Sequence, residues 1–156
     1  MDSEVELYIK RAEEEFLLSQ NDMRVSTDNK IKEILGIPSG KTFFNSVISH
    51  AYYGIFYAAK AYLLSKGIKT KVPDEHKKTY ERFMNLAYSK KIDNKLTEIY
   101  ETETIKAESL INIFFTERRK RGFFTYNIKS EANIPYAKES IENAKRFISS
   151  IKLLLE

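Results

Sequence analysis

The chain has 156 residues, a formal net charge of +4 and no cysteine. The length allows one sizeable core, so we expect a single domain over residues 1–156. The lack of cysteine excludes disulfide bonds, thiol nucleophiles and thiolate metal sites. The small positive charge permits an anionic partner without requiring one.

The first predicted helix begins at Ser3, which forms an S-x-x-E capping box with Glu6. Apolar residues recur along this helix at helical spacing, whereas Glu13, Glu14 and Glu15 are predicted to lie mostly on the opposite face. The start of the chain lacks the basic region and apolar run of a signal peptide. We therefore expect a cytoplasmic protein.

Residues 24–41 interrupt this helical pattern and are predicted to form an insertion on the bundle. Within them, residues 28–35 are predicted to form a short helix that ends at Gly36. The Pro38-Ser39-Gly40 cluster that follows indicates a turn.

Residues 43–66, FFNSVISHAYYGIFYAAKAYLLSK, are apolar on almost every side. A helix of this kind has to be surrounded by protein or by lipid. Crossing a membrane takes roughly 20 consecutive, predominantly apolar residues, and polar residues such as Asn45, His50 and Lys60 interrupt this run. The segment is therefore predicted to be the central helix of the core, in which Gly54 lets a neighbouring helix approach closely.

Three further helices are predicted downstream. The first begins at Pro73, a long one runs from about residue 95 to residue 121 with Asp93 as its N-cap, and the last begins near residue 133. No alternating pattern typical of strands competes with them. The resulting fold class is all-α, an antiparallel up-and-down bundle of four long helices plus a short additional helix.

Few residues of the chain are suited to catalysis or metal binding. The H-E-x-x-H, P-loop and G-x-S-x-G motifs do not occur in the sequence. The two histidines, His50 and His76, lie on different predicted helices, where we expect His50 to be hydrogen-bonded and partly buried and His76 to be exposed. Glu101, Glu103 and Glu108 are predicted to be solvated, so we expect no metal and no other cofactor.

Four basic residues, Arg118, Arg119, Lys120 and Arg121, end the long predicted helix, and we call them the basic cluster. Basic residues near a helix C-terminus complement the helix dipole, which is one explanation. The other is a phosphate-binding patch for RNA or a nucleotide, beside which aromatic residues such as Tyr126 are able to stack on bases.

Residues 49–59, SHAYYGIFYAA, resemble the S-R-x-Y-Y-A-x-F-H-A-A signature of HEPN domains, in particular that of small stand-alone prokaryotic members. His76 and Phe83 resemble the H-x6-F element of that branch, and residues 121–126, RGFFTY, resemble its R-x-x-A-D-Y element. The order of the predicted helices agrees as well. The resemblance covers nearly the whole chain apart from residues 24–41.

The resemblance implies an antiparallel helical bundle that often forms a homodimer. Many family members are metal-independent endoribonucleases with an R-x4–6-H motif, whereas others bind RNA or a protein partner without catalysis. Many are encoded beside a small nucleotidyltransferase as toxin–antitoxin pairs, in which the transferase can adenylylate a tyrosine near the motif. Three apolar residues off the main stripe of the long helix are candidates for the dimer contact, namely Ile105, Ile113 and Phe115.

The chain departs from the family pattern at the catalytic motif. Tyr126 stands where a histidine is expected after Arg121, and His50 and Tyr57 replace the arginine and the histidine of the signature. A histidine with a pKa of about 6.5 suits activation of a 2′-hydroxyl, whereas a tyrosine with a pKa of about 10 does not. Arg121 is still able to hold a phosphate in a bidentate contact.

Three functions therefore stay open. The one we favour is a binding module that holds RNA or a nucleotide, or docks a nucleotidyltransferase. The second is a weak metal-independent endoribonuclease, with Arg121 and Tyr126 at its site and His50 or His76 as a substitute base. The third is a purely structural helical protein.

Overall fold

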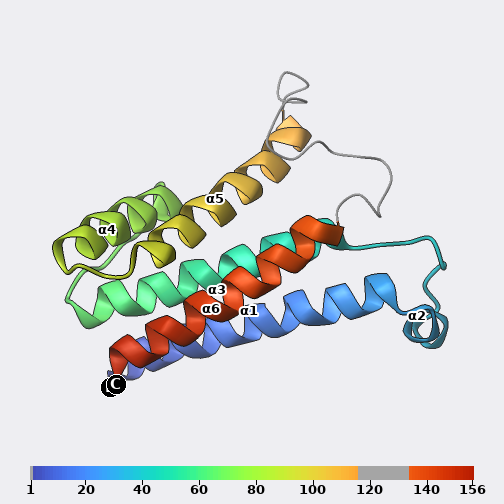
Figure 1. Ribbon diagram of the computed structural model, residues 1–156, viewed down its shortest axis with the longest axis horizontal. Helices are drawn as coiled ribbons and strands as arrows, with labels where there is room; N and C mark the ends of the chain where they lie inside the picture. Colours follow the sequence, from blue (N-terminus) through green and yellow to red (C-terminus); the bar gives the residue numbers. More distant parts are fainter. Residues whose placement is uncertain (1, 116–133) are drawn as a thin grey trace.

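The computed structural model describes residues 2–115 and 134–156, with the backbone alone at residues 109 and 111–115. These residues form six helices (Figure 1), which are α1 (Ser3–Thr27), α2 (Asn29–Leu35), α3 (Phe44–Ser65), α4 (Glu75–Ser89), α5 (Asn94–Phe115) and α6 (Ile134–Leu155). No strand occurs in the described part of the chain, which confirms the all-α class.

The helix lengths differ in part from those predicted. Four helices have 22 to 25 residues, while α4 has 15 and α2 has 7. The structure thus has two shorter helices where the sequence predicted one.

None of the helices in the described ranges combines the length and apolar character that a membrane crossing requires.

The first two helices correct the predicted boundaries. The side chain of Asp2, rather than a capping box at Ser3, caps α1 by accepting a hydrogen bond from the backbone N–H of Glu4. Helix α1 also continues to Thr27, so the predicted break at residue 24 is wrong. Asp28 then caps α2, which ends as predicted at Gly36 with a left-handed φ of 68°.

Helix α3 is the centre of the core. It packs against α1, α4, α5 and α6, and Figure 1 shows α1 and α6 along one side of it and α4 and α5 along the other. Fourteen of its 22 residues are buried. The predicted central helix is therefore confirmed.

At Gly54, helix α3 approaches both α1 and α6 closely. A Cβ atom at this position would lie 3.2 Å from the backbone oxygen of Ala12 on α1 and 3.2 Å from Cδ1 of Ile148 on α6. The absence of a side chain at Gly54 thus permits the contact with both helices, as predicted.

Three aromatic rings join α4, α5 and α6. The ring centroids of Phe83, Tyr100 and Phe147 lie 5.3 to 5.6 Å apart, and all three residues have no exposed surface. This cluster holds α4 and α5 in the positions that form the candidate site described below.

Candidate functional site

The predicted site residues divide into two groups. His50 and His76 lie on α3 and α4 in the described part of the chain. The basic cluster and Tyr126 lie outside the described residues, as does the whole of residues 121–126, which resemble the R-x-x-A-D-Y element. The two histidines are far from equivalent, because one is tied to carboxylates and the other to aromatic rings.

His50 links α3 to α1 through two carboxylates. Its Nδ1 lies 2.6 Å from Oε2 of Glu15, and its Nε2 lies 3.8 Å from Oδ2 of Asp22. Asp22 also accepts a hydrogen bond of 2.6 Å from the hydroxyl of Ser46. Both ring nitrogens therefore face carboxylates, and the expected hydrogen-bonded, partly buried state of His50 is what the structure has.

Glu15 is buried in the structure, which differs from the position predicted for it on α1. The sequence pattern placed it on the solvated face, yet only 6% of its surface is exposed. It is buried because it pairs with His50 of α3 and with Arg11, whose Nη2 lies 3.3 Å from Oε1 of Glu15. The guanidinium of Arg11 also lies 5.6 Å from the ring centroid of Tyr57. His50 and Tyr57 both differ from the S-R-x-Y-Y-A-x-F-H-A-A pattern. They are linked through α1, because Glu15 pairs with His50 and Arg11 lies against Tyr57.

His76 lies in the first turn of α4 and packs against α3. Its ring stacks on Phe56 with a centroid distance of 4.0 Å and an interplanar angle of 15°. Its Nδ1 lies 2.8 Å from the hydroxyl of Tyr52, and Tyr53 contacts the ring edge-on. His76 is exposed overall, as predicted, but one face of its ring is covered by protein.

This packing sets the protonation of His76 and Tyr52. Burial lowers the pKa of His76, an effect that Glu75 opposes and Lys60 reinforces. Burial also raises the pKa of the Tyr52 hydroxyl. At neutral pH we therefore assign a phenol that donates its proton to Nδ1 of a neutral imidazole, which leaves Nε2–H as a donor.

The pKa of His76 predicts a specific dependence of stability on pH. Because the folded pKa lies below the unfolded value, the unfolded state takes up the proton first as the pH falls. The contribution of His76 is therefore complete above about pH 6.5 and is lost as the pH falls from there through the folded pKa. We expect urea titrations to show a smaller loss of stability from about pH 7.5 to pH 5.5 in His76→Gln than in the native chain. Equal losses in the two proteins would contradict the assignment.

Two adjoining hollows lie between α3, α4 and α5, beside His76. Their volumes are about 640 and 330 Å³, and we call them together the α3–α4–α5 hollow. Four residues line both parts, namely Tyr52, His76, Lys77 and Glu108. Across the two parts, the charged lining residues are five carboxylates and one lysine, Asp74, Glu75, Glu81, Glu101, Glu108 and Lys77.

The charge of the hollow decides what it is able to bind. Carboxylates repel the phosphates of RNA, so His76 is poorly placed to act as a base on that substrate. The carboxylates are also spread along the hollow. Among the residues that the structure describes, no three His, Asp or Glu side chains are grouped so that they could hold a metal ion.

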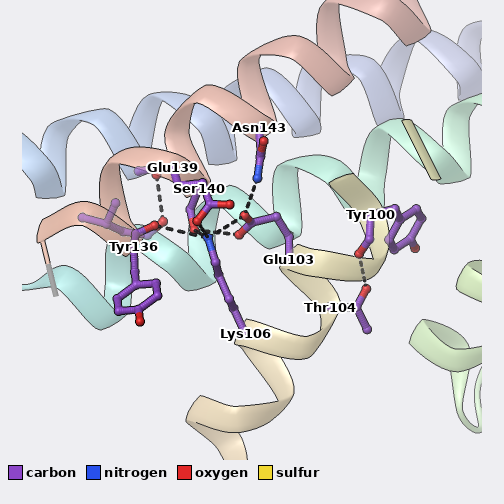
Figure 2. A network of polar contacts seen from close by, with 10 residues as sticks. Tyr100, Glu103, Thr104, Lys106, Tyr136, Glu139, Ser140 and Asn143 are labelled. Atoms are coloured by element: carbon purple, nitrogen blue, oxygen red, sulfur yellow. Dashed lines mark hydrogen bonds and ion pairs between the residues drawn. The ribbon is translucent and has the colours of Figure 1, made fainter. Parts of the chain in front are cut away.

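A buried polar network between α5 and α6 was not predicted (Figure 2). Glu103 and Lys106 have no exposed surface, and Lys106 Nζ lies 2.9 Å from Oε1 of Glu103 and 3.0 Å from Oε2 of Glu139. The hydroxyl of Ser140 and the side-chain amide of Asn143 donate to Glu103 over 2.6 and 2.9 Å. The expectation that Glu103 is solvated is therefore wrong.

One sequence signal was available for Glu103. Its position continues the spacing of Tyr100, Ala107 and Leu110, all of which are buried on the inner face of α5. The network itself offers no open position for a ligand, because each of its carboxylate and ammonium groups has partners in the protein. Its role is to join α5 to α6.

Comparison with known proteins gives no relative for this chain, since no family model, curated protein or solved structure matches it significantly. The resemblance to HEPN domains therefore rests on the sequence motifs and the order of the helices alone. The function has to be argued from the chemistry of the chain's own sites.

Proposed function

We propose that the chain is a HEPN-like protein with an antiparallel up-and-down bundle, and that it binds RNA or a nucleotide through the basic cluster without robust catalysis. The observation that carries this proposal is the charge of residues 117–121, which hold four basic residues and one acidic residue. Arg121 stands at the position of the family's motif arginine and offers a phosphate a bidentate contact.

The described sites favour binding over cleavage. His50 is engaged by Glu15 and Asp22, and His76 lies beside a hollow lined mainly by carboxylates. Metal-independent cleavage of RNA needs a base close to the phosphate that is attacked. Neither environment suits that role, whereas phosphate binding by the basic cluster needs no histidine.

The proposed assembly is a homodimer. On α5, Ile105 is 43% exposed and is a candidate for the contact, while the side chains of Ile113 and Phe115 lie outside those described. A two-fold arrangement would repeat the basic cluster in both subunits. Two such clusters close together would strengthen the attraction for a polyanion.

The test is a titration of labelled single-stranded RNA in the presence of EDTA, with cleavage followed on a gel. We expect binding at low salt that weakens about 20- to 50-fold between about 50 and 200 mM salt if three to four phosphates are contacted. Arg121→Ala should weaken binding about tenfold and reduce the salt dependence by about one phosphate contact. Arg24→Ala, an exposed arginine on α1, is the matched control and should leave binding unchanged.

Two other results would redirect the assignment. Cleavage without metal that is lost in Arg121→Ala would support the ribonuclease alternative, with Arg121 and Tyr126 at its site. Failure to bind RNA or nucleotides at low salt would contradict the phosphate-binding role. The function would then be docking of a nucleotidyltransferase partner or purely structural, with the basic cluster complementing the helix dipole.

A further inference from the structure

A basic hollow lies between the loop that precedes α4 and the exposed face of α4, and we call it the loop–α4 hollow. Its volume is about 410 Å³, and four basic residues line it, namely Lys69, Lys71, Lys78 and Arg82. Glu81 also lines it, and Nζ of Lys69 is paired with Glu4 at 2.9 Å. Three basic side chains therefore remain against one carboxylate.

The positive charge of the chain is concentrated around this hollow. Residues 66–91, which comprise α4 and the segments on either side of it, contain eight basic and three acidic residues. Their net charge of +5 exceeds the +4 of the whole chain, so the remaining residues together are net negative. A surface with this concentration of charge attracts polyanions.

Contacts with α4 fix the loop that forms one wall of the hollow. The hydroxyl of Thr70 lies 2.7 Å from the hydroxyl of Thr79, which is fully buried. Nζ of Lys78 lies 3.4 Å from the backbone oxygen of Lys71. Within the described part of the chain, the side chains of Lys71 and Arg82 form no hydrogen bond or ion pair. The fold thus gathers like charges and leaves two of them without counter-ions, which an anionic ligand would supply.

A second hollow adjoins the first along the exposed face of α4. Its volume is about 350 Å³, and Glu81 and Asn85 line both hollows. Of the two hollows, Tyr88 lines only the second, and 68% of its surface is exposed. Proteins that bind single-stranded nucleic acids combine a basic groove for the backbone with aromatic rings on which bases stack. Tyr88 offers such a ring beside the loop–α4 hollow.

The second hollow differs from the first in charge. Its charged lining residues are Glu81 and Glu101, and no basic residue of the described chain lines it. These carboxylates disfavour a phosphate, but they accept hydrogen bonds from the exocyclic amino group of a base such as cytosine. The two hollows therefore suit the two parts of a nucleotide, with the phosphate in the loop–α4 hollow and the base beside Tyr88.

We propose that the exposed face of α4 binds single-stranded RNA, with phosphates at Lys71, Lys78 and Arg82 and a base stacked on Tyr88. This face is a second RNA surface in addition to the basic cluster. The proposal rests on the proposed function for its ligand, whereas the position of the surface follows from the two hollows along α4. A single strand fits because only unpaired bases can leave their stack to reach a protein ring.

The experiment is a titration of the full chain with labelled oligocytidylate, a single-stranded RNA, at several salt concentrations. We expect Lys71→Ala combined with Arg82→Ala to weaken binding at least about tenfold at low salt. The slope of log affinity against log salt should fall by about 1.4, because two phosphate contacts to a single strand are lost. Lys10→Ala combined with Arg24→Ala removes two exposed basic side chains from α1 and should leave both quantities unchanged.

Tyr88→Ala tests the stacking. We expect binding to weaken at least about fivefold with the salt dependence unchanged, because stacking involves no phosphate. Tyr88→Phe keeps the ring and should bind like the native chain. The substituted residues are all exposed, so the variants should fold, which their melting temperatures would check.

Arg121→Ala separates this surface from the basic cluster, and we expect losses at both places. A loss in the α4 variants alone would support the α4 surface and contradict the role of the basic cluster. A loss in Arg121→Ala alone would overturn the α4 surface and leave the proposed function intact. Equal losses in the two double variants, or native binding by Tyr88→Ala, would also overturn the α4 surface, and no binding by the native chain would overturn both proposals.

Discussion

Lys106→Met is expected to lower the free energy of unfolding by about 3 to 5 kcal/mol, because it leaves the carboxylate of Glu103 buried without its counter-ion. Neither side chain has any exposed surface, so water cannot replace the lost ammonium group. Ser140 and Asn143 would still donate to the carboxylate but would not neutralise its charge. Urea titration should show this loss directly, and the melting temperature should fall by about 10 °C or more.

The same helix offers a matched control for this prediction. Lys95 and Glu98 form a pair with the same spacing on α5, but their side chains are 49% and 64% exposed. Lys95→Met should therefore change stability by less than about 1 kcal/mol. Similar small losses in the two variants would contradict the burial of the Glu103–Lys106 pair.

The double variant Glu103→Leu/Lys106→Met tests the mechanism of the loss. Replacing both members of a buried ion pair by apolar residues removes the unpaired charge, so it is often far less destabilising than removing one member. We expect the double variant to be more stable than Lys106→Met. The single variant Glu103→Leu would be measured beside it. If the double variant lost as much stability as Glu103→Leu and Lys106→Met lose together, packing rather than charge would explain the effect.

Gly54→Leu is expected to destabilise the fold by about 1 to 3 kcal/mol or more, since overpacking forces helices apart. Its Cβ would lie 3.2 Å from a backbone atom of Ala12, and backbone of α1 cannot move aside without disturbing the whole contact. Thermal and urea unfolding would measure the loss. Replacing glycine also favours the helix itself, by about 1 kcal/mol in the case of alanine, but this gain offsets only part of the loss from the clash.

Gly40→Leu is the control for this substitution. No atom lies within 4 Å of a Cβ built at Gly40, and its φ is not in the left-handed region. We expect a change within about 0.5 kcal/mol at this position. If Gly54→Leu lost no more stability than Gly40→Leu, the close packing of α1 and α6 against α3 at Gly54 would be contradicted.

The sequence by itself determined the features that depend on residues close together in the chain. Asp93 caps α5 through a hydrogen bond of 2.9 Å to the N–H of Lys95, and Gly36 ends α2. The apolar character of α3 on nearly all sides predicted its central position. In each case the physical cause is local, either a cap, a φ angle or the periodicity of one helix.

Only the tertiary structure decided which charged residues are buried and where the hollow lies. Glu103 is buried because Ser140 and Asn143, 37 and 40 residues further along the chain, supply hydrogen bonds to it. Glu15 is buried because His50 of α3 lies against it. Burial of a charged side chain is strongly unfavourable unless other groups form hydrogen bonds or ion pairs with it. For Glu103 and Glu15 some of these groups come from other helices, so the periodicity of one helix cannot predict the burial. The carboxylates of the α3–α4–α5 hollow likewise come from different parts of the chain, around α4 and on α5, that meet only when these helices pack against each other and against α3.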